Sequence, residues 1–158
     1  MTVRVRAGSA DDVAAALAVF ERSNLARRRG DWPHRVASVA RIGGHLNDPA
    51  SWLLVAEDAQ ECIAMASAEP LRGDDGAGPV DPRGCFLGYL FVVPECWGEG
   101  IGGALLDAVV AEATRRGSTV MRLWTHEDNE RSHRLYRSRG FSPTGRTTDG
   151  EGEWEREL

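Results

Sequence analysis

Apolar and polar positions at the start of the chain predict a strand followed by a helix. Residues Thr2–Arg6 alternate between polar and apolar side chains, which is the period of a strand with one buried face. Ser9 precedes the carboxylates Asp11-Asp12, and a serine N-cap followed by acidic residues suits the positive end of a helix dipole. The apolar face of this helix recurs at helical spacing as Val13, Leu17 and Phe20.

The middle of the chain predicts a second helix and two strands. Pro33 suits the first turn of a helix, and this helix ends before Asp48-Pro49. Its apolar face consists of Val36, Val39 and Leu46. Two apolar stretches, Ser51–Glu57 and Glu61–Glu69, follow as strands because a short polar turn separates them.

A change in composition divides the chain near its centre. Residues Leu71–Gly84 contain four glycines, three aspartates and two prolines, which is typical of a surface loop. The nearly continuous apolar run Cys85–Val93 then predicts a strand buried on both faces. A glycine cluster leads into a predicted helix over Ala104–Arg116, which Gly117 ends. The apolar stripe of that helix is Leu105, Leu106, Val109 and Val110.

The C-terminal part predicts a strand, a helix and two further strands. Val120–Thr125 is a strand, and Asn129–Arg139 is a helix that ends at Gly140. Phe141 begins the final strands, of which Glu153–Leu158 is the last. The resulting order is β-α-α-β-β-β-α-β-α-β-β. We therefore expect a single-domain α/β sandwich with a mostly antiparallel sheet of about seven strands and about four helices.

The bulk composition fits one globular domain without a membrane segment. The chain has 158 residues, 42% of them hydrophobic and 27% charged, and this size can bury a core without cross-links. No apolar run approaches the ~20 residues that a bilayer span requires, and the N-terminus lacks the apolar region of a signal peptide. We expect a cytoplasmic protein that does not bind membranes.

Net charge and cysteine content argue against two further kinds of function. A net charge of −5 leaves no basic stripe to neutralise phosphates, so we expect no nucleic-acid partner. The three cysteines form neither a C-x-x-C pair nor an even set, which argues against a zinc site and against disulfides. We expect no metal, and we interpret Cys62, Cys85 and Cys96 as small buried side chains.

The glycine cluster Trp97–Gly103 joins the buried strand to the following helix. Such a loop presents successive backbone N–H groups at the positive end of a helix dipole. Glycines let these groups approach a phosphate because no Cβ stands in the way. The pattern therefore predicts binding of a pyrophosphate.

A dinucleotide-binding Rossmann domain is one alternative for this loop. Gly98, Gly100 and Gly103 satisfy G-x-G-x-x-G, and the acidic pair Glu127-Asp128 follows the next strand. Residues 94–97, however, separate the first glycine from the strand, whereas a Rossmann glycine follows its strand almost directly. Too little chain also remains after the loop for a second half of such a domain.

The stretch Leu90–Leu106 resembles the acetyl-CoA signature of the GNAT superfamily, an apolar strand, a short loop and then Arg/Gln-x-x-Gly-x-Gly/Ala. Trp97 stands where that family usually has arginine or glutamine. The resemblance implies acetyl-CoA as co-substrate, with its pantetheine arm paired to the backbone of Leu90, Phe91 and Val92. The pyrophosphate would then bind at Gly98, Glu99, Gly100, Ile101, Gly102 and Gly103.

The stretch Leu123–Phe141 resembles the second signature of the same family, a strand, an asparagine, a tyrosine seven residues later, and Gly-Phe. The resemblance implies that Asn129 contacts CoA in addition to capping its helix. It also implies that Tyr136 points at the thioester sulfur. The alternative for Tyr136 is a partly buried tyrosine of the core.

The family reaction is direct attack of a neutral amine on the acetyl carbonyl. The resemblance implies that a strand N–H near Val92 stabilises the oxyanion and that Tyr136 protonates the departing thiolate. The positions where relatives often carry a carboxylate base are Phe86 and Trp124 here, and neither accepts a proton. Glu69, His126 and a water chain to solvent stay open as the route for the amine's proton.

Together, the resemblance identifies residues 1–158 as an N-acetyltransferase domain. It implies transfer of an acetyl group from acetyl-CoA to a primary amine of a small molecule or a protein, and it leaves room for a homodimer. A non-catalytic acyl-CoA-binding regulatory domain of the same fold is the alternative, and a Rossmann oxidoreductase ranks third. No motif in residues 24–48 or 71–84 identifies the acceptor.

Overall fold

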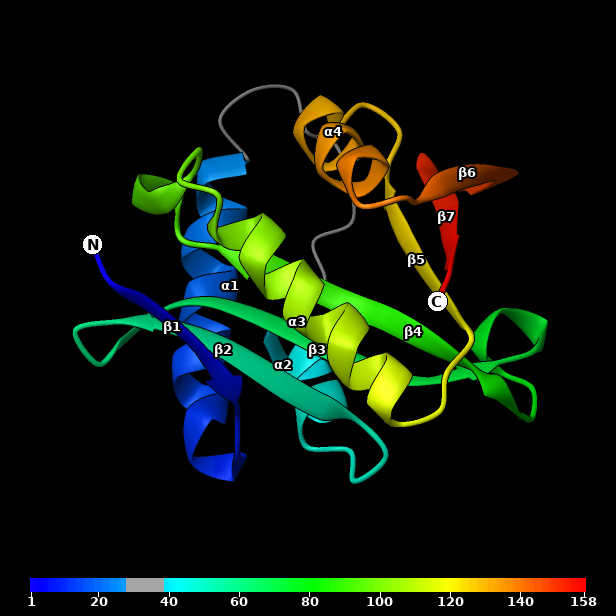
Figure 1. The fold of residues 1–158 in the computed structure, drawn as a ribbon, viewed down its shortest axis with the longest axis horizontal. Helices are drawn as coiled ribbons and strands as arrows, with labels where there is room; N and C mark the ends of the chain where they lie inside the picture. Colours follow the sequence, from blue (N-terminus) through cyan, green and yellow to red (C-terminus); the bar gives the residue numbers. More distant parts are fainter. Residues whose placement is uncertain (28–38) are drawn as a thin grey trace. The chain divides into compact units, whose positions relative to one another are not determined.

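The computed structural model describes residues 1–27 and 39–158, and its elements follow the predicted order (Figure 1). The strands are β1 (Val3–Ala7), β2 (Trp52–Asp58), β3 (Glu61–Arg72), β4 (Val80–Val92), β5 (Val120–His126), β6 (Ser142–Thr148) and β7 (Glu151–Glu157). The α-helices are α1 (Val13–Arg27), α2 (Val39–Leu46), α3 (Ile101–Arg115) and α4 (Glu130–Ser138). Short 3-10 helices are η1 (Ala10–Asp12), η2 (Asp74–Gly76) and η3 (Pro94–Cys96).

The seven strands form one mostly antiparallel sheet in the order β1-β2-β3-β4-β5-β7-β6. The pairs β1–β2, β5–β7 and β6–β7 are antiparallel, whereas β4 and β5 run parallel. The parallel ladder is short, because it joins only Gly84–Leu87 to Val120–Leu123. The predicted fold class, an α/β sandwich with about seven strands and four helices, is confirmed.

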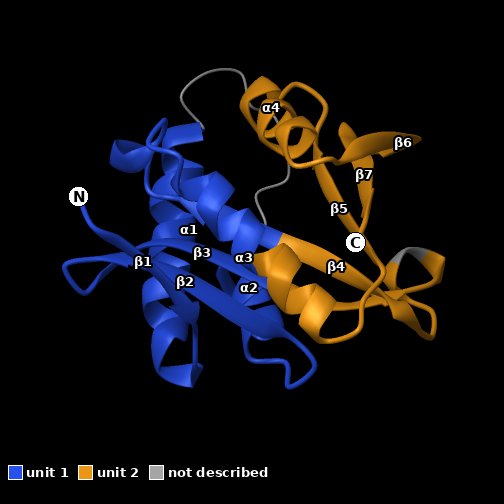
Figure 2. Cartoon of the chain, in the orientation of Figure 1, with its two compact units in different colours: residues 1–67, 89–108 blue, residues 68–88, 109–158 orange. Residues whose placement is uncertain are grey.

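The chain divides into two compact units (Figure 2). The first consists of residues 1–67 and 89–108, and it contains β1, β2, α1, α2, the end of β4 and the start of α3. The second consists of residues 68–88 and 109–158, and it contains β5, α4, β6 and β7. The glycine cluster therefore belongs to the first unit, and Asn129 and Tyr136 belong to the second.

The N-terminal elements confirm the predicted cap. The Ser9 side chain accepts a hydrogen bond from the Asp11 N–H, and the Asp12 carboxylate accepts one from the Ser9 N–H at 2.8 Å, so both ends of a capping box are present. Arg6 donates to Asp12 and to Glu57 of β2, which ties strand β1 to the helix start and to its neighbour. The Arg6 guanidinium, with the Ser9 N–H, lowers the pKa of Asp12 to about 2.

The buried faces of the first two helices differ from the predicted ones. Helix α1 buries Phe20 as expected, but Val13 and Leu17 are half-buried, and the other buried residues are Ala16, Val19 and Ser23. In α2, Ile42 and Leu46 are buried, whereas Val39, the first residue of the helix, is exposed. The predicted helix start at Pro33 and the inward Val36 lie outside the described residues.

The loop predicted over Leu71–Gly84 is wrong, because the two strands continue into it. Strand β3 extends to Arg72 and β4 begins at Val80, so Glu69 lies within its strand and not at its end. The Gly73 N–H donates to the Pro79 carbonyl at 3.0 Å and closes the hairpin around η2. A Cβ at Gly84 would lie 2.4 Å from Leu71 Cδ2, so close packing required this glycine.

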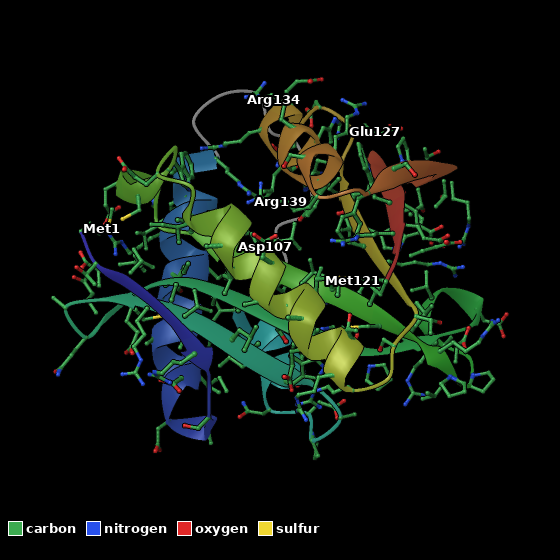
Figure 3. All side chains as sticks on the ribbon, viewed as in Figure 1. Met1, Asp107, Met121, Glu127, Arg134 and Arg139 are labelled. Atoms are coloured by element: carbon green, nitrogen blue, oxygen red, sulfur yellow. The ribbon has the colours of Figure 1, made fainter. Side chains whose placement is uncertain are left out.

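The end of α3 lies where the sequence predicts it. Gly117 ends α3 with φ +92°, and the Ser118 N–H donates to the Ala113 carbonyl, as in a helix C-cap. Met121 of β5 is fully buried (Figure 3).

No helix among the described residues is long and apolar enough to cross a membrane. In the same part of the chain, no group of three or more His, Cys, Asp or Glu side chains could hold a metal ion.

Candidate functional site

The glycine cluster of the first unit forms an exposed turn that ends in the first turn of α3. Gly98 and Gly100 have φ values of +83° and +81°, which glycine adopts readily and other residues do not. A Cβ built on either glycine meets no atom within 4 Å, so the space beside the turn is open. This geometry leaves room for a ligand to approach the backbone closely.

The helix starts earlier than predicted, so Gly102 and Gly103 belong to α3 and not to the loop. The Ala104 N–H donates to the Gly100 carbonyl at 3.1 Å, which is the first hydrogen bond of the helix. The N–H groups of Ile101, Gly102 and Gly103 precede that bond and carry the positive end of the helix dipole. Glu99 is exposed in the turn. Such an arrangement of backbone donors suits an anionic group such as a phosphate.

A tryptophan fixes this turn to the strand before it. The Trp97 Nε1 donates a hydrogen bond of 2.8 Å to the backbone carbonyl oxygen of Val92. The intervening residues form η3, where the Trp97 N–H also donates to the Pro94 carbonyl. Trp97 therefore has a structural role at the position where the family signature usually has arginine or glutamine.

The end of β4 offers backbone groups as well. The Val93 N–H donates to the Ile63 carbonyl at 2.9 Å, so β3 pairs with one side of this segment. The ladder between β4 and β5 ends at Leu87 and does not include Leu90, Phe91 or Val92. These three residues are half-buried, so the prediction of a strand buried on both faces is wrong here. A strand segment outside a ladder can pair with an extended ligand.

The first unit also contains a row of ring side chains that sequence reasoning missed. The Tyr89 hydroxyl lies 2.9 Å from His45 Nδ1, and the Tyr89 ring stacks on Phe91 at a centroid distance of 6.4 Å. Phe20 of α1 meets Phe91 edge-on at 5.1 Å, and the Arg27 guanidinium lies 5.2 Å from the Phe91 ring centroid. The spacing of Tyr89 and Phe91 by two residues predicts that both rings lie on one strand face. No sequence pattern near either residue predicts the contact with His45.

In the second unit, Asn129 caps α4 as predicted. Its Oδ1 accepts a hydrogen bond of 3.2 Å from the Ser132 N–H. The Ser132 and Thr125 hydroxyl oxygens lie 2.7 Å apart, and His133 Nε2 lies 3.0 Å from the His126 carbonyl oxygen. These contacts fix the start of α4 to the end of β5 and orient Asn129, whose Nδ2 hydrogens are its donors.

Tyr136 lies two turns further along α4 and is 7% exposed. Its ring packs against Phe141 at 5.7 Å and Trp154 at 6.4 Å. The burial fits a core tyrosine, and the aromatic contacts also hold the ring in one orientation. On the outer side of the same helix Arg131, Arg134 and Arg137 are exposed, and Figure 3 labels Arg134 there. The helix thus carries local positive charge although the whole chain has a net charge of −5.

The candidate bases Glu69 and His126 are both half-buried residues of the second unit. His126 Nε2 lies 3.9 Å from Oε1 of Glu151, a neighbour that sequence reasoning missed because the two residues meet only through the β5–β7 ladder. Trp124 lies on the same strand, with the Arg146 guanidinium 5.7 Å from its ring centroid. The position of Trp124 thus holds a cation–π contact and no proton acceptor.

Fold and sequence together establish the class of protein. The model of the acetyltransferase (GNAT) family matches residues 15–141, which is most of the chain. The protein therefore belongs to the GNAT family of acetyltransferases, and the resemblance predicted from its two motifs is confirmed.

Two individual proteins match the chain in sequence. The chain is 26% identical over 140 residues to an uncharacterised N-acetyltransferase, YhfO, of Bacillus subtilis, and this match covers 88% of the chain and 89% of the relative. A match to an uncharacterised N-acetyltransferase of Archaeoglobus fulgidus is 43% identical over 49 residues, but it spans only 31% of the chain and 33% of that protein.

Two solved structures show the same fold. The PaiA N-acetyltransferase of Thermoplasma acidophilum, in complex with coenzyme A, superposes with a TM-score of 0.78 over 100% of both chains at 18% identity. The structure of YncA from Salmonella typhimurium, with its cofactor acetyl-CoA, has a TM-score of 0.75 at 22% identity, over 100% of this chain and 95% of that one. At this level of identity the likeness concerns the fold.

Proposed function

We propose that this protein is an N-acetyltransferase that moves an acetyl group from acetyl-CoA to a primary amine. The observation that carries the proposal is the open glycine turn at the start of α3, directly after a β4 segment that lies outside the β4–β5 ladder. Membership of the GNAT family supports it, as do the coenzyme A in the structure of PaiA and the acetyl-CoA in that of YncA.

The first unit would hold the pantetheine arm and the pyrophosphate of the coenzyme. The backbone of Leu90, Phe91 and Val92 would pair with the pantetheine amides, as an added strand does. The N–H groups that begin α3, together with Gly98–Gly100, would bind the pyrophosphate. The residues fit this role, because the turn is open and exposed and its glycines already have the required backbone angles.

Acetyl-CoA supplies an activated thioester, and three groups of the protein would act on the reaction. The Val92 N–H would donate to the oxygen of the attacked carbonyl and stabilise its negative charge. Tyr136 would protonate the departing thiolate, and Asn129 would donate an amide hydrogen to the coenzyme. Glu69 and His126 stay candidates for the base, and water is the third route for the amine's proton.

The alternative is a regulatory domain of the same fold that binds acyl-CoA without turnover. The presence of Tyr136 at the signature position favours the enzyme, because a binding module needs no proton donor at the sulfur. We expect acetyl-CoA to bind, and NAD and NADP not to bind, in calorimetric titrations. Binding of the nicotinamide cofactors with no response to acetyl-CoA would overturn the proposal.

An acceptor screen separates the enzyme from the regulator. Amines of different classes are offered together with acetyl-CoA, and release of the CoA thiol is followed. We expect at least one primary amine to be acetylated. Tight binding of acetyl-CoA without turnover on any amine would favour the regulatory domain.

A further inference from the structure

The pair formed by Tyr89 of β4 and His45 of α2 is a part-buried polar contact of the first unit. The Tyr89 hydroxyl and His45 Nδ1 are 2.9 Å apart, and the ring centroids are 5.7 Å apart. Both side chains are half-buried, so they are reachable from solvent and yet held in place. Both residues belong to the first unit, which also contains the glycine turn.

The surroundings hold each partner in one orientation. The Tyr89 ring stacks on Phe91, which is itself packed edge-on against the buried Phe20. His45 lies in the last turn of α2, and its carbonyl oxygen accepts a hydrogen bond of 2.7 Å from the Ser51 hydroxyl.

The position of Tyr89 connects this pair to the proposed chemistry. Tyr89 directly precedes Leu90–Val92, the segment whose backbone would pair with pantetheine. Its ring stacks on Phe91, so the two side chains lie on the same strand face. Tyr89 and His45 are 44 residues apart in sequence and meet only in the folded chain.

We propose that Tyr89 and His45 form a proton relay for the acceptor amine. The proposal rests on the proposed N-acetyltransferase function. A phenol can accept a proton while it donates its own, because its oxygen has two lone pairs. With the imidazole proton on Nε2, the Tyr89 hydroxyl donates to His45 Nδ1 and leaves a lone pair for an amine N–H.

The step balances without any further reactant. The amine nitrogen forms a bond to the acetyl carbon, and the carbon–sulfur bond of the thioester breaks. The amine proton moves to the Tyr89 oxygen while the Tyr89 proton moves to His45 Nδ1. The resulting imidazolium releases its Nε2 proton to water, and the CoA thiolate takes a proton from Tyr136. Proton exchange with water then reprotonates the Tyr136 oxygen and restores the Nε2–H tautomer of His45. Tyr89 is then the residue that touches the amine, and His45 acts through it.

The test compares three variants at saturating acetyl-CoA. Tyr89→Phe keeps the ring and its stacking, and His45→Ala removes the proton acceptor. His45→Asn is the matched control for structure, because its side-chain oxygen can still accept the Tyr89 hydrogen bond but cannot carry a proton. We expect each to lower kcat about 100-fold, with KM for acetyl-CoA and the unfolding midpoint nearly unchanged. Added imidazole should restore part of the His45→Ala activity.

The outcomes separate this relay from the proposed function. If His45→Asn keeps wild-type kcat, the pair only joins α2 to β4 and the relay is overturned, while the acetyltransferase stands. The relay also fails if Glu69→Gln or His126→Ala costs 100-fold in kcat while the Tyr89 and His45 variants do not. If the wild type acetylates no amine although it binds acetyl-CoA, both proposals fall together.

Discussion

The indole Nε1 of Trp97 donates a 2.8 Å hydrogen bond to the backbone carbonyl oxygen of Val92, the last residue of β4. The bond joins the glycine turn to the strand segment that precedes it, so the two proposed contact regions for CoA are held as one piece. At the position where the family usually has arginine or glutamine, this chain therefore has a side chain that positions the backbone of the glycine turn.

We expect Trp97→Phe to weaken both the fold and CoA binding slightly. The variant keeps an aromatic ring but loses the hydrogen bond, whose net contribution is about 1 kcal/mol. The same amount in binding free energy corresponds to about a fivefold rise in the Kd for CoA. Urea unfolding and calorimetry measure the two effects. Trp52→Phe at the start of β2 is the control for the loss of a tryptophan elsewhere in the chain. An unchanged Kd for CoA in Trp97→Phe would show that the turn does not depend on this bond.

A comparison of two glycines tests the proposed phosphate site. Gly100 and Gly117 have φ values of +81° and +92°, and a Cβ on either meets no atom within 4 Å. Alanine at either position should therefore cost a similar ~1–2 kcal/mol of backbone strain. Only Gly100→Ala adds a methyl group beside the proposed pyrophosphate, so only this variant should raise the Kd for acetyl-CoA, by more than tenfold. If Gly100→Ala and Gly117→Ala change the Kd for acetyl-CoA equally, the glycine turn is not part of the phosphate site.

Tyr136→Phe should lower kcat with little change in stability. The phenylalanine ring keeps the contacts to Phe141 and Trp154, and only the hydroxyl is lost. General acids contribute about 10²–10⁴ in rate, and we expect about 10² because water can partly replace the donor. The measurement is made where chemistry limits the rate, with CoA affinity as the control. Wild-type kcat in the variant would return Tyr136 to a purely structural role in the core.

The base is tested by the pH dependence of the rate. We compare kcat/KM of the wild type with those of Glu69→Gln and His126→Ala across the pH range where the acceptor amine is mostly protonated. The neutral amine increases tenfold per pH unit there, so the rate should rise steadily if the amine alone titrates. If a substitution lowers kcat/KM more than 100-fold and also removes a break that the wild-type profile shows, the substituted residue is the base.

Cys85 should not react with thiol reagents in the folded protein. Burial raises its pKa to about 12, so at pH 8 only about one thiol in ten thousand is ionised. Cys62 and Cys96 are half-buried, and labelling of the native protein should involve these two alone. Cys85→Ala should leave the native count unchanged and lower the count in denaturant from three to two. Rapid labelling of Cys85 in the native state would contradict the burial.

Stability should depend on pH through Asp12. The Arg6 hydrogen bonds and the Ser9 N–H lower its pKa from 3.8 to about 2 in the folded state, so the native protein binds fewer protons than the unfolded chain between these values. The contribution is complete above about pH 5 and is lost as the pH falls toward 2. The difference in urea midpoint between wild type and Asp12→Asn should therefore shrink from pH 7 to pH 3. A constant difference would show that the ion pair contributes nothing, as for many exposed pairs.

Local signals in the sequence determined the order of elements and several of their ends. Ser9 and Asn129 cap helices and Gly117 ends one, because each acts on backbone groups only a few residues away. The glycine turn was also predictable, since its backbone angles depend on the residues in the turn itself. The two motifs that identify the family are continuous in sequence for the same reason.

Only the tertiary structure decided what depends on residues far apart in the chain. The composition of Leu71–Gly84 indicates a loop, but pairing of β3 with β4 extends both strands into it. The ladder between β4 and β5 ends at Leu87, which no local pattern shows. His126 meets Glu151, and Tyr89 meets His45, because strand register and helix packing bring them together. A side chain's type is local, whereas its partner is set by the free energy of the whole fold.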